Sequence, residues 1–378
     1  MGRIRNAFED WKQYWKYLNS KRMPEVDNCT DTRMNECSIK KVAFYIGCED
    51  NRSERYRVFN IIGELRQKNI AVDIYRAHCV NQLLGDINYD ILIVFREDRY
   101  RLLRLKKVLN HVHTCGVPII YDTDDYTIKD ENTRGAQHVL SIINHVDAMT
   151  VTTQFLADRF HERTGKDVYV IKNTINKEQI RIAKKLVKIP LENEKVRIVY
   201  QSGTPTHNHD FEQAEAALVT ILQRFSYVEL HIFGPLELSE QFAPYSRQIY
   251  FHPYVDYRLL EVYVSDMDIN IAPLELNDFN HSKSELKIFE SALLKIPTVA
   301  SPTKTYASII KNEVNGFLAT TTEDWVRDLS CLILDKKNRI EMGRRAECDF
   351  VPAYDIEHEI IQVIDIYEKV KEKFSKNQ

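Results

Sequence analysis

Long apolar runs are missing from this sequence. No stretch reaches the roughly 18 residues that a membrane-spanning helix needs, and the N-terminus Met1-Gly-Arg-Ile-Arg-Asn lacks the apolar core of a signal peptide. We therefore expect a chain that does not span a membrane and is not exported by the signal-peptide route.

An excess of charge of one sign is missing as well. The 52 basic and 55 acidic residues give a formal net charge of -3. No overall field attracts a polyanion, so we expect no nucleic-acid partner, and any anion site has to be local.

Paired cysteines are also absent. The seven cysteines are scattered and include no C-x-x-C pair, which argues against a disulfide framework and against a zinc site. A reducing, cytoplasmic location fits this usage best.

What the chain does have is enough length for two domains. With 378 residues, of which 44% are hydrophobic, it can bury two cores. Strand-like and helix-like patterns begin to alternate near Lys41, and this alternation predicts parallel sheets. The expected strands are 42–46, 71–75, 91–95, 118–121, 148–151 and 168–171, then 196–200, 228–233, 249–251, 269–272 and 298–300.

The break between these two series defines the predicted domains. Lys and Glu runs and Pro190 interrupt the pattern within 173–195. We expect a polar and amphipathic extension at 1–40, a Rossmann-like domain at 41–190, a second at 191–350, and at 351–378 a helix that crosses back toward the first domain. The fold class is therefore α/β, with two doubly wound domains facing a cleft.

Residues 4–18 form an amphipathic pattern at the start of the extension. Aromatic and aliphatic side chains recur near one helical stripe with basic residues around it. Such a segment can lie on an anionic bilayer, or it can dock on the protein itself or on a second subunit. Peripheral membrane contact and self-association both stay open.

The run Phe279-Asn-His-Ser-Lys-Ser-Glu-Leu-Lys-Ile-Phe-Glu290 carries the most functional information. If a helix begins at 283, a turn of about 100° per residue places Lys283, Lys287 and Glu290 within about 60° of one another. Amides at a helix start and lysines attract phosphate, and a carboxylate two turns on accepts from ribose hydroxyls. This combination suits a nucleotide sugar.

A purely structural explanation stands beside that one. Ser282 and Glu285 have the spacing of a capping box, and Lys287 and Glu290 would then be a solvated helix face. Flanking strand patterns at 268–275 and 296–301 favour the functional interpretation, because helices that follow strands in an open α/β sheet border the ligand crevice.

A second candidate is Tyr121-Asp-Thr-Asp-Asp125, which follows an expected strand. Its carboxylates, Asp124 and Asp125 among them, would point into the expected cleft. The alternatives are aspartates that cap the next turn, or an Asp-x-Asp clamp for a divalent cation. Arg55 and Arg57, which follow the first expected strand, would either contact a phosphate or sugar of the acceptor or be solvated at a helix start.

With these motifs in place, the chain resembles the family-4 retaining glycosyltransferases of the GT-B fold, in the rhamnosyltransferase-like branch with a Phe-Asn-x-x-Lys-Ser-x-x-Lys-x-x-Glu signature. The similarity covers about 41–350 and includes Tyr200-Gln-Ser-Gly203, Phe233-Gly234-Pro235 and Asn315-Gly316-Phe317-Leu318. These motifs are weak singly and fairly specific in their order.

The resemblance implies a role for each matching residue. Glu290 corresponds to the ribose-binding glutamate, and Lys283 and Ser284 fall where relatives hold the diphosphate. Gly203 and Thr204 lie in the loop whose amides approach phosphate, with His209 as a further donor there, and Tyr254 and Val255 lie in the loop that cups the base. Gly234 and Lys287 complete the predicted donor site. The resemblance also implies that Asp124 or Asp125 orients an acceptor hydroxyl or contacts the donor sugar. Lys283, Glu290, Asp124 and Asp125 are the residues to which we assign the chemistry.

One departure from the family pattern leaves the donor open. Many relatives carry Glu-x7-Glu, whose first carboxylate touches the donor sugar, but this chain has Ser282 eight residues before Glu290. Either Asn280 or Glu275 takes over sugar recognition, or the donor differs.

The expected reaction is transfer of a hexose or deoxyhexose from a nucleotide diphosphate to a glycan or lipid-linked glycan, with retention and without a metal or other cofactor. The leaving phosphate takes the acceptor proton in a same-face attack, so no strong protein base is needed. Two alternatives remain, a non-catalytic GT-B subunit, which Ser282 favours, and a nucleotide-sugar 2-epimerase. The sequence leaves the base, sugar, acceptor and linkage undetermined.

Overall fold

A computed structural model describes residues 37–48, 51–97, 102–130, 132–186, 195–203, 208–253, 255 and 259–377. Three of the sequence predictions lie outside these residues: the amphipathic segment 4–18 and the proposed donor-site residues Thr204 and Tyr254.

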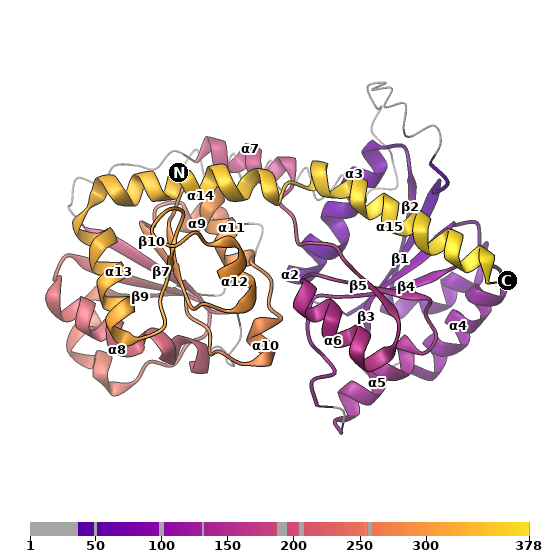
Figure 1. Cartoon of the computed structure of the whole chain (residues 1–378), viewed down its shortest axis with the longest axis horizontal. Coiled ribbons are helices and arrows are strands. Elements are labelled where there is room, and N and C mark those ends of the chain that lie inside the picture. The colour runs from indigo at the N-terminus through magenta and orange to yellow at the C-terminus, as the bar shows by residue number, and fades with distance from the viewer. Residues whose placement is uncertain are drawn as a thin grey trace. The chain divides into compact units, whose positions relative to one another are not determined.

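The chain divides into two compact units, coloured by residue number in Figure 1. The N-terminal unit comprises the described part of Trp15–Asn176 together with Ser282–Ser284 and Asp355–Gln378. The C-terminal unit comprises Lys177–His281 and Glu285–Tyr354 in its described part. The short segment Ser282–Ser284 therefore belongs to a different unit from the residues on either side of it.

The N-terminal unit contains a six-stranded sheet in the order β2-β1-β3-β4-β5-β6, and every pairing is parallel. Its strands are β1 (Lys41–Gly47), β2 (Ala71–Arg76), β3 (Ile91–Glu97), β4 (Ile119–Thr123), β5 (Ala148–Val151) and β6 (Asp167–Val170). The chain changes direction across the sheet between β1 and β3, and in open α/β sheets this switch point borders the ligand site.

Helices cover both faces of this sheet. The elements are α2 (Asn51–Glu54), the π-helical turn η2 (Arg55–Phe59), α3 (Asn60–Gln67), η3 (Ala77–Leu84), α4 (Leu102–Thr114), α5 (Arg134–Ile143), α6 (Gln154–Thr164) and α15 (Ile356–Lys376). The C-terminal helix α15 lies beside α3 and is therefore part of the N-terminal unit (Figure 1). Buried aliphatic and aromatic side chains from the strands and helices fill the core between them.

The C-terminal unit repeats this design with the strand order β12-β11-β10-β7-β8-β9. Its strands are β7 (Val196–Gln201), β8 (Val228–Phe233), β9 (Ile249–His252), β10 (Ile269–Ala272), β11 (Thr298–Ala300) and β12 (Phe317–Leu318). Here the switch point lies between β7 and β10, so the loops that follow these two strands border the expected ligand site.

The helices of this unit are α7 (Lys177–Lys185), α8 (Asn208–Arg224), η5 (Glu240–Gln248), α9 (Leu260–Val264), α10 (Asp278–His281), α11 (Leu286–Leu293), α12 (Lys304–Ile309), α13 (Thr322–Leu334) and α14 (Lys336–Ala353). Helices α8 and α13 pack against each other over a core that includes Trp325 and Phe211 (Figure 1). A capping box between Thr321 and Asp324 fixes the start of α13.

The predicted fold class and strands are confirmed, with ends that differ by one or two residues. The short strand β12 was not predicted. The predicted helix start at 283 is wrong, because α11 begins at Leu286. In the described part of the chain, none of the helices combines the length and the hydrophobicity that a bilayer span requires.

Candidate functional site

A bulge at the switch point shapes the edge of the N-terminal sheet. Ile46 pairs with Phe95 and Gly47 pairs with Glu97, so Arg96 is the extra residue of β3 and adopts a positive φ of 47°. A Cβ atom on Gly47 would lie 2.2 Å from the carbonyl oxygen of Arg96, so only glycine fits there. Bulges of this kind redirect a side chain beside a site.

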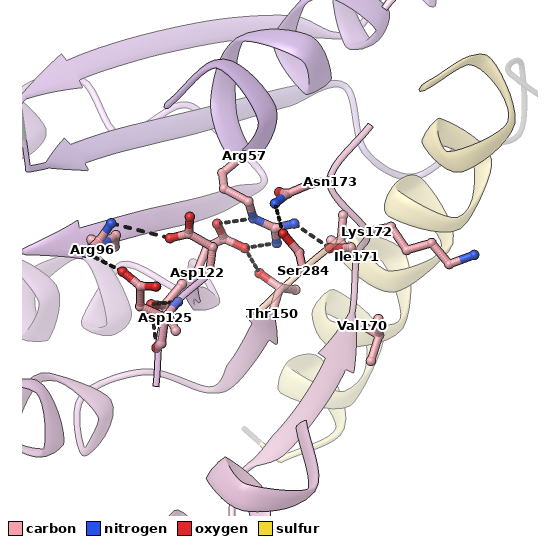
Figure 2. Close-up of polar contacts among 12 residues, drawn as sticks. Arg57, Arg96, Asp122, Asp125, Thr150, Val170, Ile171, Lys172, Asn173 and Ser284 are labelled. Atoms are coloured by element: carbon pink, nitrogen blue, oxygen red, sulfur yellow. Dashed lines mark hydrogen bonds and ion pairs between the residues drawn. The ribbon is translucent and has the colours of Figure 1, made fainter. Parts of the chain in front are cut away.

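The side chain that this bulge redirects contacts both aspartates predicted from the sequence. The Arg96 guanidinium lies 3.4 Å from Asp124 Oδ1 and 3.0 Å from Asp125 Oδ2 (Figure 2). The exposed fraction is 10% for Asp124 and 40% for Asp125, so Asp125 is the carboxylate that a ligand reaches more readily.

The third aspartate of the motif has an internal role. Asp122 accepts from Arg57 Nε at 3.0 Å and from the Thr150 hydroxyl at 2.6 Å, while Arg57 also donates to the carbonyl oxygen of Ile171 (Figure 2). Burial alone would lower the pKa of the Arg57 guanidinium, but Asp122 outweighs this effect and raises it. The predicted alternatives for Arg57, an acceptor contact or a solvated side chain, are therefore corrected: it is a buried partner of Asp122.

Arg55 is also buried rather than solvated. It is 1% exposed, and its guanidinium lies 5.5 Å from the centre of the Tyr56 ring. Both arginines lie in the π-helical turn η2, in which all five residues are buried.

The Lys-Ser segment of the signature lies in a loop, and the N-terminal unit holds it. Thr153 Oγ1 donates to the carbonyl oxygen of Ser282 at 3.3 Å, and Asn173 Nδ2 donates to Ser284 Oγ at 2.9 Å. Figure 2 shows the Asn173 amide turned toward Ser284. Lys283 and Ser284 are partly exposed between these two anchors.

The loop position also corrects both sequence interpretations of this segment. Lys283 is outside the helix, so it does not share a helical stripe with Lys287 and Glu290. Ser282 does not cap α11 either, because the N-cap residue is Glu285 and its side chain makes no cap hydrogen bond.

Helix α11 itself carries Lys287 and Glu290 one turn apart. Both residues are partly exposed as a whole, but the Lys287 Nζ atom is buried. The Lys287 ammonium lies 4.9 Å from the centre of the Tyr200 ring, a cation–π arrangement at the end of β7. Because α11 follows β10 in a parallel sheet, its amino end lies on the carboxyl side of the sheet, where the ligand crevice is expected.

Carboxylates surround the buried Tyr306 of α12 in the same unit. Burial raises the pKa of the Tyr306 phenol, and the charges of Glu285, Asp210 and Glu290 raise it further. The field near the start of α11 is therefore of mixed sign rather than purely positive.

The loops after β7 and β8 touch through their backbones. Ser202 N donates to the carbonyl oxygen of Phe233 at 2.8 Å, and a Cβ atom on Gly234 would lie 2.2 Å from the carbonyl oxygen of Ser202. Gly234 also has a φ of 94°, which favours glycine. Gly234 thus brings the Ser202–Gly203 turn against the neighbouring loop.

His209 and Asp210 at the start of α8 have different environments. The His209 side chain is 79% exposed and lies 3.4 Å from Glu212. Asp210 is buried and accepts from Asn280 Nδ2 at 2.7 Å and from the backbone of Glu275 at 3.2 Å. Asn280, which was one candidate for sugar recognition, therefore uses its amide to bind Asp210.

Next to the predicted base loop, rings stack across β8 and β9. His252 stacks on Phe233 at 4.2 Å, and His231 Nδ1 lies 2.9 Å from His252 Nε2. Tyr250 stacks on His231 at 4.9 Å. Val255, the described member of the predicted base loop, packs on the apolar cluster that includes Phe233.

The sequence analysis did not identify two residues of the N-terminal unit, Arg96 and Asn173, as part of the candidate site. Arg96 gives no local signal, because its effect comes from a bulge that only strand pairing creates. Asn173 follows β6 in a polar run, and its contact with Ser284 joins positions 111 residues apart.

Among the described residues, no cluster of three or more His, Cys, Asp or Glu side chains is arranged to hold a metal ion. Asp122 and Asp124, the carboxylates with the Asp-x-Asp spacing of the alternative metal clamp, instead contact Arg57 and Arg96, respectively. The absence of a metal requirement stays a prediction.

Comparison with known proteins relates the second sheet to one enzyme family and the fold to several solved structures. Residues 197–335 match the family model described as Glycosyl transferases group 1, which covers less than half of the chain. No functionally curated protein sequence matches.

Solved structures resemble the chain over most of its length. HepE of Anabaena, in complex with UDP and glucose, has a TM-score of 0.61 and 14% identity over 87% of this chain and 100% of that chain. Sucrose-phosphate synthase of Thermosynechococcus elongatus has a TM-score of 0.62 and 13% identity, and the match covers 88% of this chain and 99% of that chain. TarM of S. aureus has a TM-score of 0.56 and 16% identity, and the match covers 76% of this chain and 58% of that chain.

These findings establish the fold and the general class of enzyme. The two parallel six-stranded sheets and the similar structures define a GT-B fold. With a glycosyltransferase group 1 match over the second sheet, the chain is a glycosyltransferase.

Proposed function

We propose that this protein is a retaining family-4 glycosyltransferase that moves a hexose or deoxyhexose from a nucleotide diphosphate to a glycan or lipid-linked glycan. Solved structures of similar fold contain UDP or a UDP-sugar, which supports a nucleotide-sugar donor. The chemistry suits surface polysaccharide or glycoconjugate assembly in the cytoplasm. Peripheral membrane contact or self-association through 4–18 remains a prediction.

The observation that carries this proposal is the placement of Lys287 and Glu290 on α11. They lie one turn apart within the segment that matches the glycosyltransferase family model; Glu290 is partly exposed, and the Lys287 Nζ atom is buried near the Tyr200 ring. An ammonium group near the helix start stabilises diphosphate, and the carboxylate accepts from ribose hydroxyls. We assign Lys283 and Ser284, in the preceding loop, to the diphosphate as well.

The donor phosphates also need backbone donors. We assign this role to the Gly203 turn, which Gly234 holds in place, and to Thr204 beside it. His209 is exposed enough to add a donor, and Tyr254 and Val255 would border the base.

Two steps follow for the reaction. The bond between the anomeric carbon and the diphosphate oxygen breaks, and the lysines and amides stabilise the charge that develops on the leaving diphosphate. The acceptor hydroxyl attacks the same face of the sugar, and its proton passes to the leaving phosphate. Asp125, held with Asp124 by Arg96, orients that hydroxyl.

Substitution at the donor site tests the proposal. Glu290→Ala and Lys283→Ala should each lower kcat/KM for the nucleotide sugar by about 100-fold, since each removes a charged contact to the donor. Glu341→Ala and Lys336→Ala change exposed residues of α14 and serve as charge-matched controls. Wild-type rates in both site variants, with folding intact, would reject the assignment.

A donor panel separates the proposed transferase from the two alternatives. Purified protein is incubated with UDP-glucose, UDP-galactose, GDP-mannose or dTDP-rhamnose, with and without acceptor. Release of free nucleotide supports a transferase, conversion of the labelled donor to its 2-epimer without acceptor indicates an epimerase, and binding without turnover indicates a non-catalytic subunit.

A further inference from the structure

Two side chains of the N-terminal unit bind the segment 282–284, which we call the lysine loop. Thr153 Oγ1 donates to the carbonyl oxygen of Ser282 at 3.3 Å. Asn173 Nδ2 donates to Ser284 Oγ at 2.9 Å, the contact drawn in Figure 2. By its contacts the lysine loop groups with the N-terminal unit. A hydrogen bond therefore anchors the residue on each side of Lys283.

The two anchoring side chains are buried at the carboxyl edge of the N-terminal sheet. Thr153 follows β5 and Asn173 follows β6, and these two strands pair with each other. The exposed fractions of the two residues are 5% and 1%. Thr153 is also the N-cap of α6, where its Oγ1 accepts from the Leu156 amide at 3.2 Å. Next to Asn173, the carbonyl oxygen of Thr174 accepts from Asn60 Nδ2 at 2.6 Å. Buried side chains on a backbone held in this way have a fixed direction.

Within the described residues, the Asn173 amide makes this one hydrogen bond. Its Nδ2 atom donates to Ser284 Oγ, and its Oδ1 atom is buried without a partner there. A buried polar atom that lacks a hydrogen bond lowers stability, and an apolar side chain of similar size would avoid that loss. The contact with Ser284 is therefore what the amide contributes at this position.

Anchoring on both sides restricts where the Lys283 ammonium can go. The Lys283 side chain is partly exposed, and a lysine stem is long and flexible. When the backbone of the lysine loop is already held, binding an anion has to order the side chain alone, so less conformational entropy is lost. A misplacement of about 1 Å can lower a rate about 100-fold, so the position of the lysine loop matters for catalysis.

We propose that Asn173 and Thr153 are positioning residues for donor binding, and that they hold the lysine loop so that Lys283 meets the diphosphate. This inference rests on the proposed function, which assigns Lys283 to the diphosphate. It goes beyond that function because both residues lie outside the segment 197–335 that matches the glycosyltransferase family model. Neither side chain needs to touch the donor itself.

A double-mutant cycle tests whether Asn173 acts through Lys283. With a donor that the wild type turns over, Asn173→Ala should lower kcat/KM about tenfold, because the lysine loop loses its hydrogen bond to the amide. In the Lys283→Ala background the same substitution should change kcat/KM by no more than about twofold, since no ammonium is left to position. Losses that multiply in the double variant would overturn the positioning role, as would a wild-type rate in Asn173→Ala.

Thr174→Val is the matched control for Asn173→Ala. Thr174 is the next residue, it is 1% exposed, and its Oγ1 atom is buried without a hydrogen-bond partner in the described part of the chain. Valine has nearly the same shape as threonine, so kcat/KM should stay within about twofold of the wild type. A loss as large as that of Asn173→Ala would show that any change in this buried segment impairs the enzyme, and would overturn the specific role of the amide.

Thr153 gives an independent test in case Asn173→Ala does not fold. Thr153→Val should lower kcat/KM about threefold, less than Asn173→Ala because the Thr153 hydrogen bond to the lysine loop is longer. Thr153→Ser keeps a hydroxyl and should restore kcat/KM to within about twofold of the wild type.

Thr133→Val controls for the helix cap that Thr153→Val removes. Thr133 caps α5 in the same unit, and its Oγ1 accepts from the Ala136 amide at 3.1 Å. This variant loses a cap without a contact to the lysine loop, so kcat/KM should not change. Equal losses in Thr153→Val and Thr133→Val would assign the effect to capping and overturn the role of Thr153.

Inhibitors separate loop positioning from general damage. UDP, GDP and dTDP are compared with uridine, guanosine and thymidine, which have no phosphate for Lys283 to meet. In Asn173→Ala, the inhibition constant of the diphosphate that inhibits the wild type should rise about tenfold, while that of its nucleoside should stay within about twofold. Equal weakening of both would overturn the proposal. A wild type that neither binds any of these diphosphates nor turns over a donor would instead contradict the proposed function, so the two failures are distinguishable.

Discussion

Arg57 and Asp122 form a two-point ion pair in the interior of the N-terminal unit. The Arg57 Nη2 and Nε atoms lie 2.5 and 3.0 Å from the two carboxylate oxygens, and the side chains are 0% and 4% exposed. The pair joins the turn after β1 to the end of β4, directly before Asp124 and Asp125 in the sequence. Figure 2 shows Arg57 turned toward Asp122.

Breaking this pair should destabilise the protein strongly. Asp122→Asn leaves the Arg57 charge buried and uncompensated by Asp122, which we expect to cost about 3–5 kcal/mol of unfolding free energy. Urea denaturation followed by circular dichroism measures it. Arg159→Ala is the control, because it removes a partly exposed arginine that pairs with Glu162 on α6. It should change the unfolding free energy by about 0.5 kcal/mol or less. Equal effects of both substitutions would show that the buried pair has no special role.

Gly234→Ala should destabilise the contact between the loops that follow β7 and β8. The added Cβ atom combines an unfavourable φ of 94° with a 2.2 Å approach to the carbonyl oxygen of Ser202. Gly116→Ala is the matched control, because Gly116 has a φ of 84° and its Cβ atom would meet nothing within 4 Å. The control should cost about 1–2 kcal/mol from strain alone.

Unfolding free energies measure the difference between these two glycine variants. We expect Gly234→Ala to cost more than Gly116→Ala by about 1 kcal/mol or more, because the loop has to shift. Nucleoside diphosphate binding should weaken only in Gly234→Ala. If the two variants lose the same unfolding free energy, the loop after β8 moves without a free-energy cost. The contact between a Cβ atom at position 234 and the Ser202 carbonyl oxygen would then not constrain this loop.

Stability should fall on acidification because of His231. Burial, assisted by His252, lowers the pKa of His231 from its ordinary value of 6.5 to about 4, although Glu229 opposes the shift. Between these values the unfolded chain binds a proton that the folded protein excludes. The contribution of His231 is therefore complete above about pH 6.5 and is lost as the pH falls toward 4.

A histidine variant isolates this effect. The unfolding free energy of the wild type minus that of His231→Gln should decrease as the pH falls from 6.5 to 4. A constant difference for His231 would show that the folded protein protonates it without penalty.

Turnover should not depend on a divalent metal ion. Asp122 and Asp124 are the carboxylates that an Asp-x-Asp metal clamp would use, and they contact Arg57 and Arg96, whose positive charges oppose cation binding. Transfer rates after treatment with EDTA, and after addition of manganese or magnesium, should agree within about twofold. A rate that collapses with EDTA and recovers with manganese would favour the clamp.

Much of the fold was predictable because its signals are local. Short apolar strands alternate with amphipathic helices, and this pattern identified the strands of both sheets other than β12. The two-residue strand Phe317–Leu318 is too short to give a periodic signal. The start of α11 was misplaced because Ser282 and Glu285 have capping-box spacing, although contacts to Thr153 and Asn173 hold residues 282–284 in a loop.

The sequence by itself determined which elements form and which residue types are available for chemistry, because hydrophobic period, turn residues and the Lys-Ser-x-x-Lys-x-x-Glu spacing are written along the chain. Only the tertiary structure decided that Asp122 is buried with Arg57 while Asp125 reaches solvent, and that Arg96 lies in a bulge facing both Asp124 and Asp125. Burial and side-chain direction depend on strand register and on partners far away in the sequence, and no local pattern encodes those partners.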